Sequence, residues 1–196
     1  MNILKNSMLE QGYWMNSSNN KVLILSGGLG KRYGTPKALA AYKGETFLDS
    51  IVSKCLSLNL QVYVVINPTL DSLIPQKRDF ITIIGDSDKD MYDSVIKGVK
   101  RIKEFSKLIV WPVDHPFVSS TTVKSLLDTN NDNKFIVPSF CGRLGHPVIF
   151  PKSAEALLKK LQNLKDLTHA IGRIILEVDD EGVLLNINRK EDIPSR

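Results

Sequence analysis

The sequence predicts an α/β fold of three layers, in which helices cover both faces of a mostly parallel sheet with a small antiparallel portion. Three observations lead to this prediction. Through the first two-thirds of the chain, short apolar runs alternate with segments of helical periodicity, as in parallel sheets with crossover helices. The apolar runs are continuous, as in strands that are buried on both faces. From residue 135 onward, short strands follow one another closely and indicate the antiparallel portion.

Apolar runs and the residues that end them define the elements of the first two-thirds. The predicted strands are 22–25, which ends in a glycine-rich stretch, 62–66, which ends at Asn67-Pro68, 81–84, which ends at Gly85-Asp86, and 108–113. Apolar residues at helical spacing predict helices over 47–58 and 91–102. Either Ser119 or Ser120 caps a further helix, which contains Val123, Leu126 and Leu127.

The last third of the chain has a different order of elements. Short strands are predicted at 135–137 and 148–150. A helix follows that contains Leu157, Leu158 and Leu161. A second helix, with His169 at its start, runs through Ala170, Ile171, Ile174 and Ile175. The apolar segment 183–187 is predicted to form the last strand.

Length and composition indicate one domain, which we place at residues 21–196. The chain has 196 residues, of which 42% are hydrophobic and 24% are charged, a composition typical of a globular domain. Residues 1–20 are polar and lack the apolar centre of a signal peptide, so we interpret them as a flexible tail. No apolar run approaches the roughly 20 residues that a membrane-spanning helix needs. Two cysteines without C-x-x-C spacing predict no disulfide framework, as in a cytoplasmic protein.

The net charge of +5 agrees with a polyanionic small molecule as partner as well as with nucleic acid. Basic residues occur as separate pairs along the chain, and no aromatic residues are grouped with them for base stacking. We therefore expect small polyanionic partners, with no nucleic acid and no membrane among them. The sequence leaves the oligomeric state open.

The glycine-rich stretch after the first predicted strand is the first candidate site. Backbone amides of Ser26-Gly27-Gly28-Leu29-Gly30 can approach phosphate oxygens, and Lys31, Arg32 and Lys37 add positive charge. The stretch is not a P-loop, and the dinucleotide fingerprint fails because it requires glycine where Tyr33 stands. The alternative is a glycine-rich turn with solvated basic residues. We favour phosphate binding because three basic residues accompany the glycines.

Two further candidate sites follow other predicted strands. Asp114 comes directly after the fourth strand, where its carboxylate can hold Mg²⁺ against triphosphate oxygens. The alternative is an aspartate that caps a turn. Ser94 lies at a predicted helix start, where it can meet a nucleotide, and a simple N-cap is the alternative there. The histidines have no metal-site spacing, but His115 and His146 lie in predicted loops, where either one can contact a ligand.

Three motifs and the closing segment of the chain resemble the molybdenum-cofactor nucleotidyltransferase-like proteins. The motifs are Leu-x-Gly-Gly-x-Gly-x-Arg-x-Gly-x-Pro-Lys at 25–37, Pro-Val-Asp-His-Pro at 112–116 and Gly-Arg-x-Gly-His-Pro-Val-x-Phe at 142–150, and the closing segment is 182–192. The first motif is typical of the superfamily. The Gly-His-Pro segment is more particular to the molybdopterin cytidylyltransferase branch.

The resemblance implies a Rossmann-like nucleotidyltransferase fold and a Mg²⁺-dependent reaction. In that reaction an acceptor phosphate attacks the α-phosphorus of a nucleoside triphosphate, and pyrophosphate is released. The catalytic residues that it implies are Lys37, Arg32 and Asp114. The residues expected to bind the nucleotide or acceptor are Ser26, Gly27, Gly28, Gly30, Lys31, Ser94 and His146. Asp114 is the expected principal ligand of Mg²⁺, and Asn188 is a second ligand through its side-chain carbonyl.

The chain departs from the family pattern in its closing segment and leaves the substrates open. Asn186 and Asn188 stand where the family usually has aspartate, so they offer a carbonyl without its charge. Ser26-Gly27-Gly28 is closer to the guanylyltransferase branch, whereas the Gly-His-Pro segment points to the cytidylyltransferase branch. Asp93-Ser94-Val95 is similar to a segment of methylerythritol-phosphate cytidylyltransferases.

The base is therefore that of CTP or GTP, and the acceptor is a small phosphorylated molecule. Molybdopterin is the first choice of acceptor, and a sugar or polyol phosphate is the alternative. The rival from another class is a nucleotide-binding regulatory protein that has lost turnover.

Overall fold

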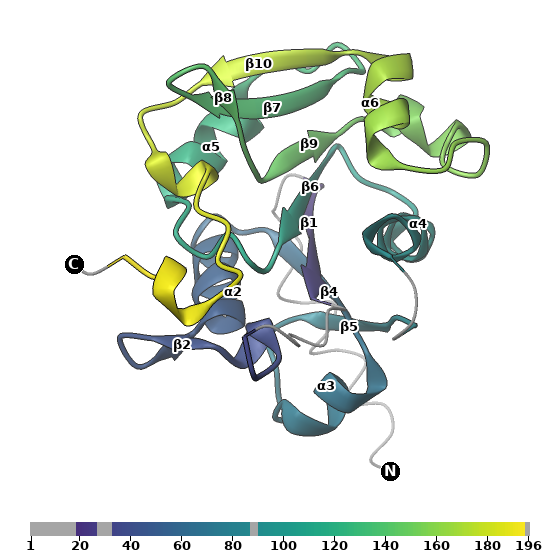
Figure 1. The fold of residues 1–196 in the computed structure, drawn as a ribbon. Helices are drawn as coiled ribbons and strands as arrows, with labels where there is room; N and C mark the ends of the chain where they lie inside the picture. The colour runs from purple at the N-terminus through teal and green to yellow at the C-terminus, as the bar shows by residue number, and fades with distance from the viewer. Residues whose placement is uncertain (1–18, 27–32, 87–89, 195–196) are drawn as a thin grey trace.

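The described part of the chain, residues 19–26, 33–86 and 90–194 of a computed structural model, forms one main sheet covered by helices (Figure 1). The order of strands in this sheet is β10-β7-β9-β6-β1-β4-β5, and β8 pairs with β7. The strands are β1 (Asn20–Ser26), β4 (Gln61–Ile66), β5 (Ile81–Ile84), β6 (Lys107–Pro112), β7 (Phe135–Phe140), β8 (Arg143–Leu144), β9 (Val148–Phe150) and β10 (Arg173–Glu177). A separate hairpin, which the sequence did not predict, pairs β2 (Ala41–Tyr42) with β3 (Glu45–Thr46).

The directions of the strands confirm the predicted mostly parallel sheet with an antiparallel portion. β1 pairs in parallel with β4 and β6, β4 pairs in parallel with β5, and β10 pairs in parallel with β7. β9 runs antiparallel to both β6 and β7, and β8 runs antiparallel to β7. β7 and β9 are the strands predicted from the short apolar runs after residue 134, whereas β8 was not predicted.

Helices on the two faces of the sheet give the three predicted layers. The helices are α2 (Phe47–Ser57), α3 (Pro68–Leu73), α4 (Met91–Ile102), α5 (Ser120–Asp128) and α6 (Leu164–Ile171). Val22 and Ile24 of β1 face a core that includes residues of α2 and α5, whereas Leu23 and Leu25 face a core that includes residues of α4 and α6. Figure 1 shows α2 and α5 on one side of the sheet and α4 and α6 on the other. Within the described ranges, no helix is long and apolar enough to cross a membrane.

Glycine allows α4 to pack closely on the central strand β1. A Cβ atom at Gly98 would stand 2.4 Å from Cδ2 of Leu23, which is fully buried. Real Cβ atoms do not approach other carbons so closely, because packed interiors leave no room for overlap. The absence of a side chain at Gly98 therefore allows α4 to lie this close to β1.

Polar side chains cap the helices at the points where the chain leaves the sheet. Ser119 caps α5 by accepting a hydrogen bond from the Thr122 amide, which decides between the two serines predicted for this role. Asn67 caps α3 in the same way, and Pro68 occupies its first turn. From the sequence, Asn67-Pro68 was predicted only to end a strand, so this short helix was not predicted.

Three predicted elements of the last third are wrong. Leu157, Leu158 and Leu161 lie in turns that follow a 3-10 helix, Lys152–Ala156. The amides of Leu157 and Leu158 bond to carbonyls three residues back, and only that of Leu161 bonds four residues back. The predicted helix through Ile174 and Ile175 ends instead at Gly172, which has a φ of 86°. Beyond that glycine the chain is extended, as β10.

The same helix end corrects the position of His169. It lies in the last turn of α6 and not at the start of a helix, because Asn163 caps α6 six residues earlier. The predicted strand 183–187 is also wrong. Its start is part of a 3-10 helix, Glu181–Val183, and Asp180 caps this turn through the Gly182 amide.

Candidate active site

The candidate site begins where β1 and β6 end side by side. Leu25 of β1 is opposite Pro112 of β6, and the Val113 amide donates a hydrogen bond of 3.1 Å to the Leu25 carbonyl. Ser26 and Asp114 therefore leave the same carboxyl edge of the sheet. Ligands of open α/β sheets bind at such an edge, because the loops there diverge and leave a crevice.

Lys37 links this edge to the end of the chain. It begins a 3-10 helix, Lys37–Leu39, and its Nζ lies 3.0 Å from Oδ2 of Asp114 and 2.7 Å from Oδ1 of Asn188. Asp114 is 77 residues away in the sequence and Asn188 is 151 residues away. The side chains of Lys37 and Asp114 are 19% and 22% exposed, so the ion pair is half-buried but open to a ligand.

The closing segment is fixed to the site by its backbone. The Ile187 amide donates to the Asp114 carbonyl at 2.8 Å, and Nδ2 of Asn188 donates to Oδ1 of Asn186 at 2.9 Å. Oδ2 of Asp192 accepts the amides of Asn188 and Arg189, each at 2.8 Å. These two hydrogen bonds lower the pKa of the Asp192 carboxyl, because they stabilise its charged form. The segment thus presents the side-chain amide of Asn188 to Lys37, with Asn186 behind it, without being a strand.

His115, which is buried, and His146, which is half-buried, lie together beside Asp114. Their ring centroids are 4.9 Å apart, and Nε2 of His115 lies 4.0 Å from Oδ1 of Asp114. Burial, followed by the proximity of His146, lowers the pKa of His115 to about 4, against a smaller opposite effect of Asp114. Burial also lowers the pKa of His146. Burial therefore favours the neutral form of both rings.

His146 is held in place by a tight backbone contact. Its amide donates to the Val183 carbonyl at 2.9 Å, and a Cβ atom at Gly145 would stand only 2.3 Å from that carbonyl oxygen. The peptide bond between His146 and Pro147 is cis. The Gly-His-Pro segment recognised in the sequence therefore lies against the closing segment, and glycine is needed for the contact.

Four buried polar atoms in this region have no hydrogen-bond partner among the residues that the structure describes. They are Oγ of Ser26, Oδ1 of Asp114, Nδ1 of His115 and Nδ1 of His146. Buried polar groups are normally satisfied, since an unmet hydrogen bond costs about 1–3 kcal/mol. Their concentration at one edge of the sheet indicates that this edge is built to receive a polar ligand.

The donor set fits a magnesium ion that is shared with a substrate. The oxygens that would hold it are Oδ1 of Asp114, which is unpartnered, and the side-chain carbonyls of Asn188 and Asn186. In the described ranges there is no group of three or more His, Cys, Asp or Glu residues that could hold a metal alone. Mg²⁺ is commonly held by one or two carboxylates together with substrate phosphates.

The remaining predicted residues are outside this cluster or outside the described ranges. Gly27, Gly28, Gly30, Lys31 and Arg32 fall in the part of the chain that is not described. Oγ of Ser94 donates to the Asp90 carbonyl at 3.3 Å, and Asp90 caps α4. In residues 33–86 and 90–194, no hydrogen bond or ion pair joins Ser94 to Lys37 or Asp114. Asp90 is the N-cap, and Ser94 lies in the first turn of α4, where its hydroxyl donates to the carbonyl four residues earlier.

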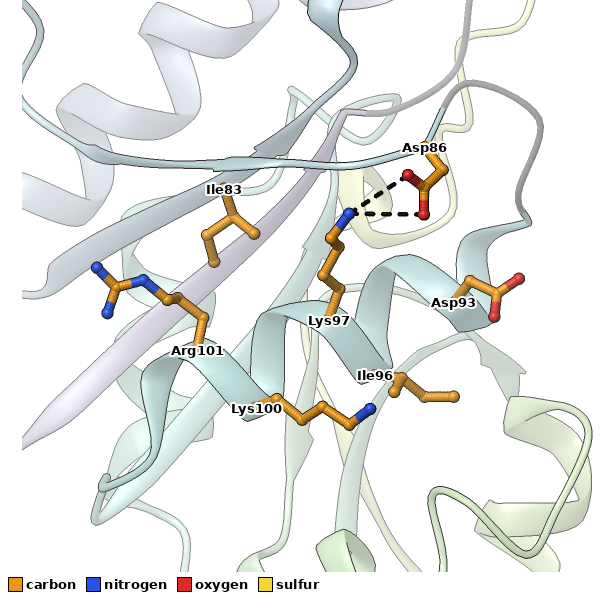
Figure 2. A pocket seen from close by; sticks show the side chains of 7 residues that line it. All are labelled: Ile83, Asp86, Asp93, Ile96, Lys97, Lys100 and Arg101. Carbon is orange, nitrogen blue, oxygen red and sulfur yellow. Dashed lines mark hydrogen bonds and ion pairs between the residues drawn. The ribbon is translucent and has the colours of Figure 1, made fainter.

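An open groove of about 580 Å³ lies elsewhere, between β5 and α4. Figure 2 shows Lys97 of α4 reaching across it to Asp86, 3.4 Å away, with Ile83 of β5 pointing toward the helix. None of the lining residues belongs to the cluster around Lys37. The lining residues are Ile83, Asp86, Asp93, Ile96, Lys97, Lys100 and Arg101.

Asp192 and the Val183 carbonyl accept the backbone amides that position the site, and these roles were not predicted from the sequence. Both lie in or near the closing segment that resembles the nucleotidyltransferase-like proteins, but neither was given a role. Asp192 could have been found, because an aspartate four residues after Asn188 can accept backbone amides as in a capped turn. The Val183 carbonyl carries no sequence signal, since any residue offers a carbonyl.

Comparison with known proteins shows what the whole chain is similar to. The family model of the MobA-like NTP transferase domain matches residues 22–180. A protein of Bacillus cereus (strain B4264) named probable molybdenum cofactor guanylyltransferase is 29% identical over 188 residues, which cover 87% of this chain and 92% of that one.

Two solved structures share the fold at low sequence identity. A Mycobacterium tuberculosis H37Rv protein in complex with manganese has a TM-score of 0.70 at 16% identity, with 88% of this chain and 94% of that chain covered. The 2-C-methyl-D-erythritol 4-phosphate cytidylyltransferase of Thermus thermophilus has a TM-score of 0.66 at 20% identity, with the same shares covered, 88% and 94%.

Proposed function

The chain belongs to the MobA-like NTP transferase family, and from this membership we propose that it transfers GMP from GTP to molybdopterin. The chain is a nucleotidyltransferase of the MobA-like type. GTP and molybdopterin are the substrates that the name of the Bacillus cereus relative suggests. Ser26-Gly27-Gly28, closer to the guanylyltransferase branch, agrees with GTP, whereas the Gly-His-Pro segment keeps CTP as the alternative.

The observation that carries the proposal is the contact of Lys37 with Asp114 and Asn188. It joins the end of the glycine-rich motif, the second residue after β6 and the closing segment at the carboxyl edge of the sheet. A cation and a carboxylate at such an edge suit phosphate transfer, which depends mainly on alignment and on neutralisation of charge. The four unpartnered buried atoms beside them are available to a ligand.

The proposed reaction is a displacement at the α-phosphorus of the triphosphate. A phosphate oxygen of the acceptor forms a new bond to this phosphorus, and the bond from it to the bridging oxygen of the β-phosphate breaks. The electron pair leaves with pyrophosphate. Lys37 follows the charge that develops on the α-phosphate, and Asp114 would hold a divalent cation, with the carbonyl of Asn188 as a second ligand. A bound Mg²⁺ would neutralise triphosphate oxygens and orient them.

Further roles belong to the same proposal. The amides of Ser26, Gly27, Gly28 and Gly30 and the charges of Lys31 and Arg32 would surround the triphosphate. His146, a neutral side chain beside Asp114, would contact the acceptor or the base. Residues 21–196 would act as one domain, in the cytoplasm, where the free thiols of Cys55 and Cys141 stay reduced.

Asp114→Asn tests whether the carboxylate holds the metal. The variant should keep the fold and lose at least about 100-fold in the rate of pyrophosphate release, because charge stabilisation in the transition state is lost. Raising Mg²⁺ or replacing it by Mn²⁺ should restore part of the activity. The measurement is the rate against metal concentration for both proteins, with circular dichroism as the control of folding.

Superimposable curves for wild type and variant would remove Asp114 from the site and favour a turn-capping aspartate. The base is identified in the same preparation by thermal shift with each nucleoside triphosphate, since a ligand that binds only the folded state raises the melting temperature. Nucleotide binding without any pyrophosphate release would point to the regulatory alternative.

A further inference from the structure

At the candidate site, the ammonium group of Lys37 donates hydrogen bonds to oxygens that a divalent cation would need as ligands. Nζ of Lys37 contacts Oδ2 of Asp114 at 3.0 Å and Oδ1 of Asn188 at 2.7 Å. Oδ1 of Asn186 accepts the side-chain amide of Asn188. Only Oδ1 of Asp114 is left unpartnered in this set, and it is buried. A cation that enters the free protein therefore has one free side-chain oxygen and must displace Lys37 to reach two others.

The charge of the cluster also opposes a cation that arrives alone. Asp114 and Lys37 carry opposite unit charges, and the two asparagines that accompany them carry none. Asp192, four residues after Asn188, accepts the amides of Asn188 and Arg189 and keeps its charge, which the nearby positive charge of Arg189 offsets. The cluster is thus close to neutral, whereas a pair of carboxylates at the positions of Asp114 and Asn188 would leave a net negative charge even beside Lys37.

A nucleoside triphosphate changes this balance. It brings about four negative charges and a set of oxygens that can complete the coordination of a hard cation. Lysine is a point charge on a flexible stem of four carbons, so it can turn from a carboxylate to a phosphate without a change in the backbone. Once Lys37 has turned, both oxygens of Asp114 and the carbonyl of Asn188 would be free to hold a cation.

We propose that this site takes its divalent cation only together with the triphosphate, and that Lys37 enforces this order. In the free protein Lys37 stands in for the cation at Asp114. With the nucleotide bound, Lys37 moves to the phosphates and releases the carboxylate. The inference rests on the proposed function for the identity of the nucleotide, but the competition between Lys37 and a metal concerns this chain alone.

Competition between Lys37 and a divalent cation predicts that Lys37→Met increases the affinity of the free protein for the cation. Methionine keeps most of the length of the side chain and removes its charge, so Oδ2 of Asp114 and Oδ1 of Asn188 become free. The free variant should bind a divalent cation about tenfold or more tightly than the wild type, because a like charge in direct contact with the ligands is gone. A variant that damages a residue of a metal site ordinarily has the opposite effect.

The experiment is a titration of the full chain with Mn²⁺, followed by the electron paramagnetic resonance signal of the free ion. The wild type alone should bind on the order of millimolar or more weakly, like the weakest oxygen-ligand sites. Lys37→Met should bind more tightly, and Lys97→Met should match the wild type. The control removes the same charge from an exposed ion pair with Asp86, away from the site.

A second variant protects the test against a fold defect in the first. Asn188→Asp adds a carboxylate while Lys37 stays in place, and it should also raise the affinity of the free protein for Mn²⁺. Addition of an uncleavable α,β-methylene analogue of GTP should give the wild type a ternary complex, detected as enhanced water-proton relaxation by bound Mn²⁺. Circular dichroism confirms that each variant is folded.

Three results would overturn the inference. They are micromolar binding of Mn²⁺ by the free wild type, equal affinities of folded Lys37→Met and Lys97→Met, and no relaxation enhancement when the analogue is bound. Failure of the proposed function would appear elsewhere, as a lack of pyrophosphate release by the wild type. The Mn²⁺ affinities of the free proteins do not depend on that activity.

Discussion

The two cysteines show how the fold sets the chemistry of single residues. Cys55 lies on the buried face of α2, and burial raises the pKa of its thiol to about 12. Cys141 is exposed in the segment that joins β7 to β8, where its φ is 49°. A thiol reacts as its thiolate, so residues of the same type differ here in reactivity by their surroundings alone.

Thiol labelling should therefore find one reactive cysteine in the native protein. Because burial raises the pKa of Cys55, its thiol is scarcely ionised at pH 8, and the side chain is shielded as well. Iodoacetamide should modify Cys141 within minutes and leave Cys55 unmodified until the protein is unfolded in guanidinium chloride. Mass spectrometry of tryptic peptides gives the readout, and Cys141→Ser is the control. Rapid native labelling of Cys55 would contradict the packing of α2.

At the site, the identity of the residues could be predicted from the sequence better than the contacts between them. Asp114 could be placed at the edge of the sheet because an apolar strand precedes it. The contact of Lys37 with Asn188 could not be predicted, since it joins positions 151 residues apart through the topology of the whole chain. The neutral pair of His115 and His146 has the same origin, because burial is a property of the fold and not of the local sequence.

At the scale of elements, prediction succeeded where periodicity and end signals agree. β1 has a continuous apolar run that ends at a glycine-rich stretch, α2 and α4 have apolar residues at helical spacing, and the structure contains all three. The region after residue 150 failed because short apolar runs fit a helix, a strand or a turn equally well. Gly172 was the local sign of a helix end that the apolar periodicity across it concealed.

The contact of α4 with β1 gives a prediction for this pair of elements. Gly98→Ala should destabilise the protein by about 1–3 kcal/mol, because the new methyl group overlaps Leu23. Leu23→Ala should cost about 2–5 kcal/mol by leaving a cavity. In that background Gly98→Ala should be neutral or stabilising, since it fills space and alanine favours a helix over glycine by about 1 kcal/mol.

Urea unfolding of the four proteins in this cycle measures the coupling. Lys97→Ala, on the exposed part of the same helix, is the control and should change the free energy of unfolding by less than about 0.5 kcal/mol. Additive effects of the two substitutions would mean that α4 moves away from β1 to accept the methyl group.

At the scale of the molecule, the domain should need nothing before β1. The carbonyl of Asn19 accepts a hydrogen bond from the Ser106 amide at 2.6 Å, and β1 starts at Asn20, one residue before the predicted domain boundary. Residues 1–18 contain no apolar run longer than three residues, so they offer no continuous apolar segment to the core. Deleting residues 1–18 should therefore shift the melting temperature by less than about 2 °C, within the small change expected when no core contact is lost.

Differential scanning fluorimetry and pyrophosphate release from the shortened chain check this expectation. A fall of the melting temperature by several degrees, or a large loss of activity, would show that the segment packs on the domain or contributes to the site. Deletion of residues 1–26 is the comparison, because it removes β1 and should abolish folding.

The position of β9 in the sheet determines how much of the chain must be synthesised before the main sheet can be completed. β9 lies between β6 and β7, where Ile149 is opposite both Ile109 and Ile136, so β7 and β10 join the main sheet through it. In a nascent chain whose residue 150 has not yet been synthesised, β6 is an apolar edge strand without the partner that β9 provides. Such edges pair with other chains, so release from the ribosome before this point yields an aggregation-prone fragment, whereas the arrival of β9 covers that edge from within the same chain.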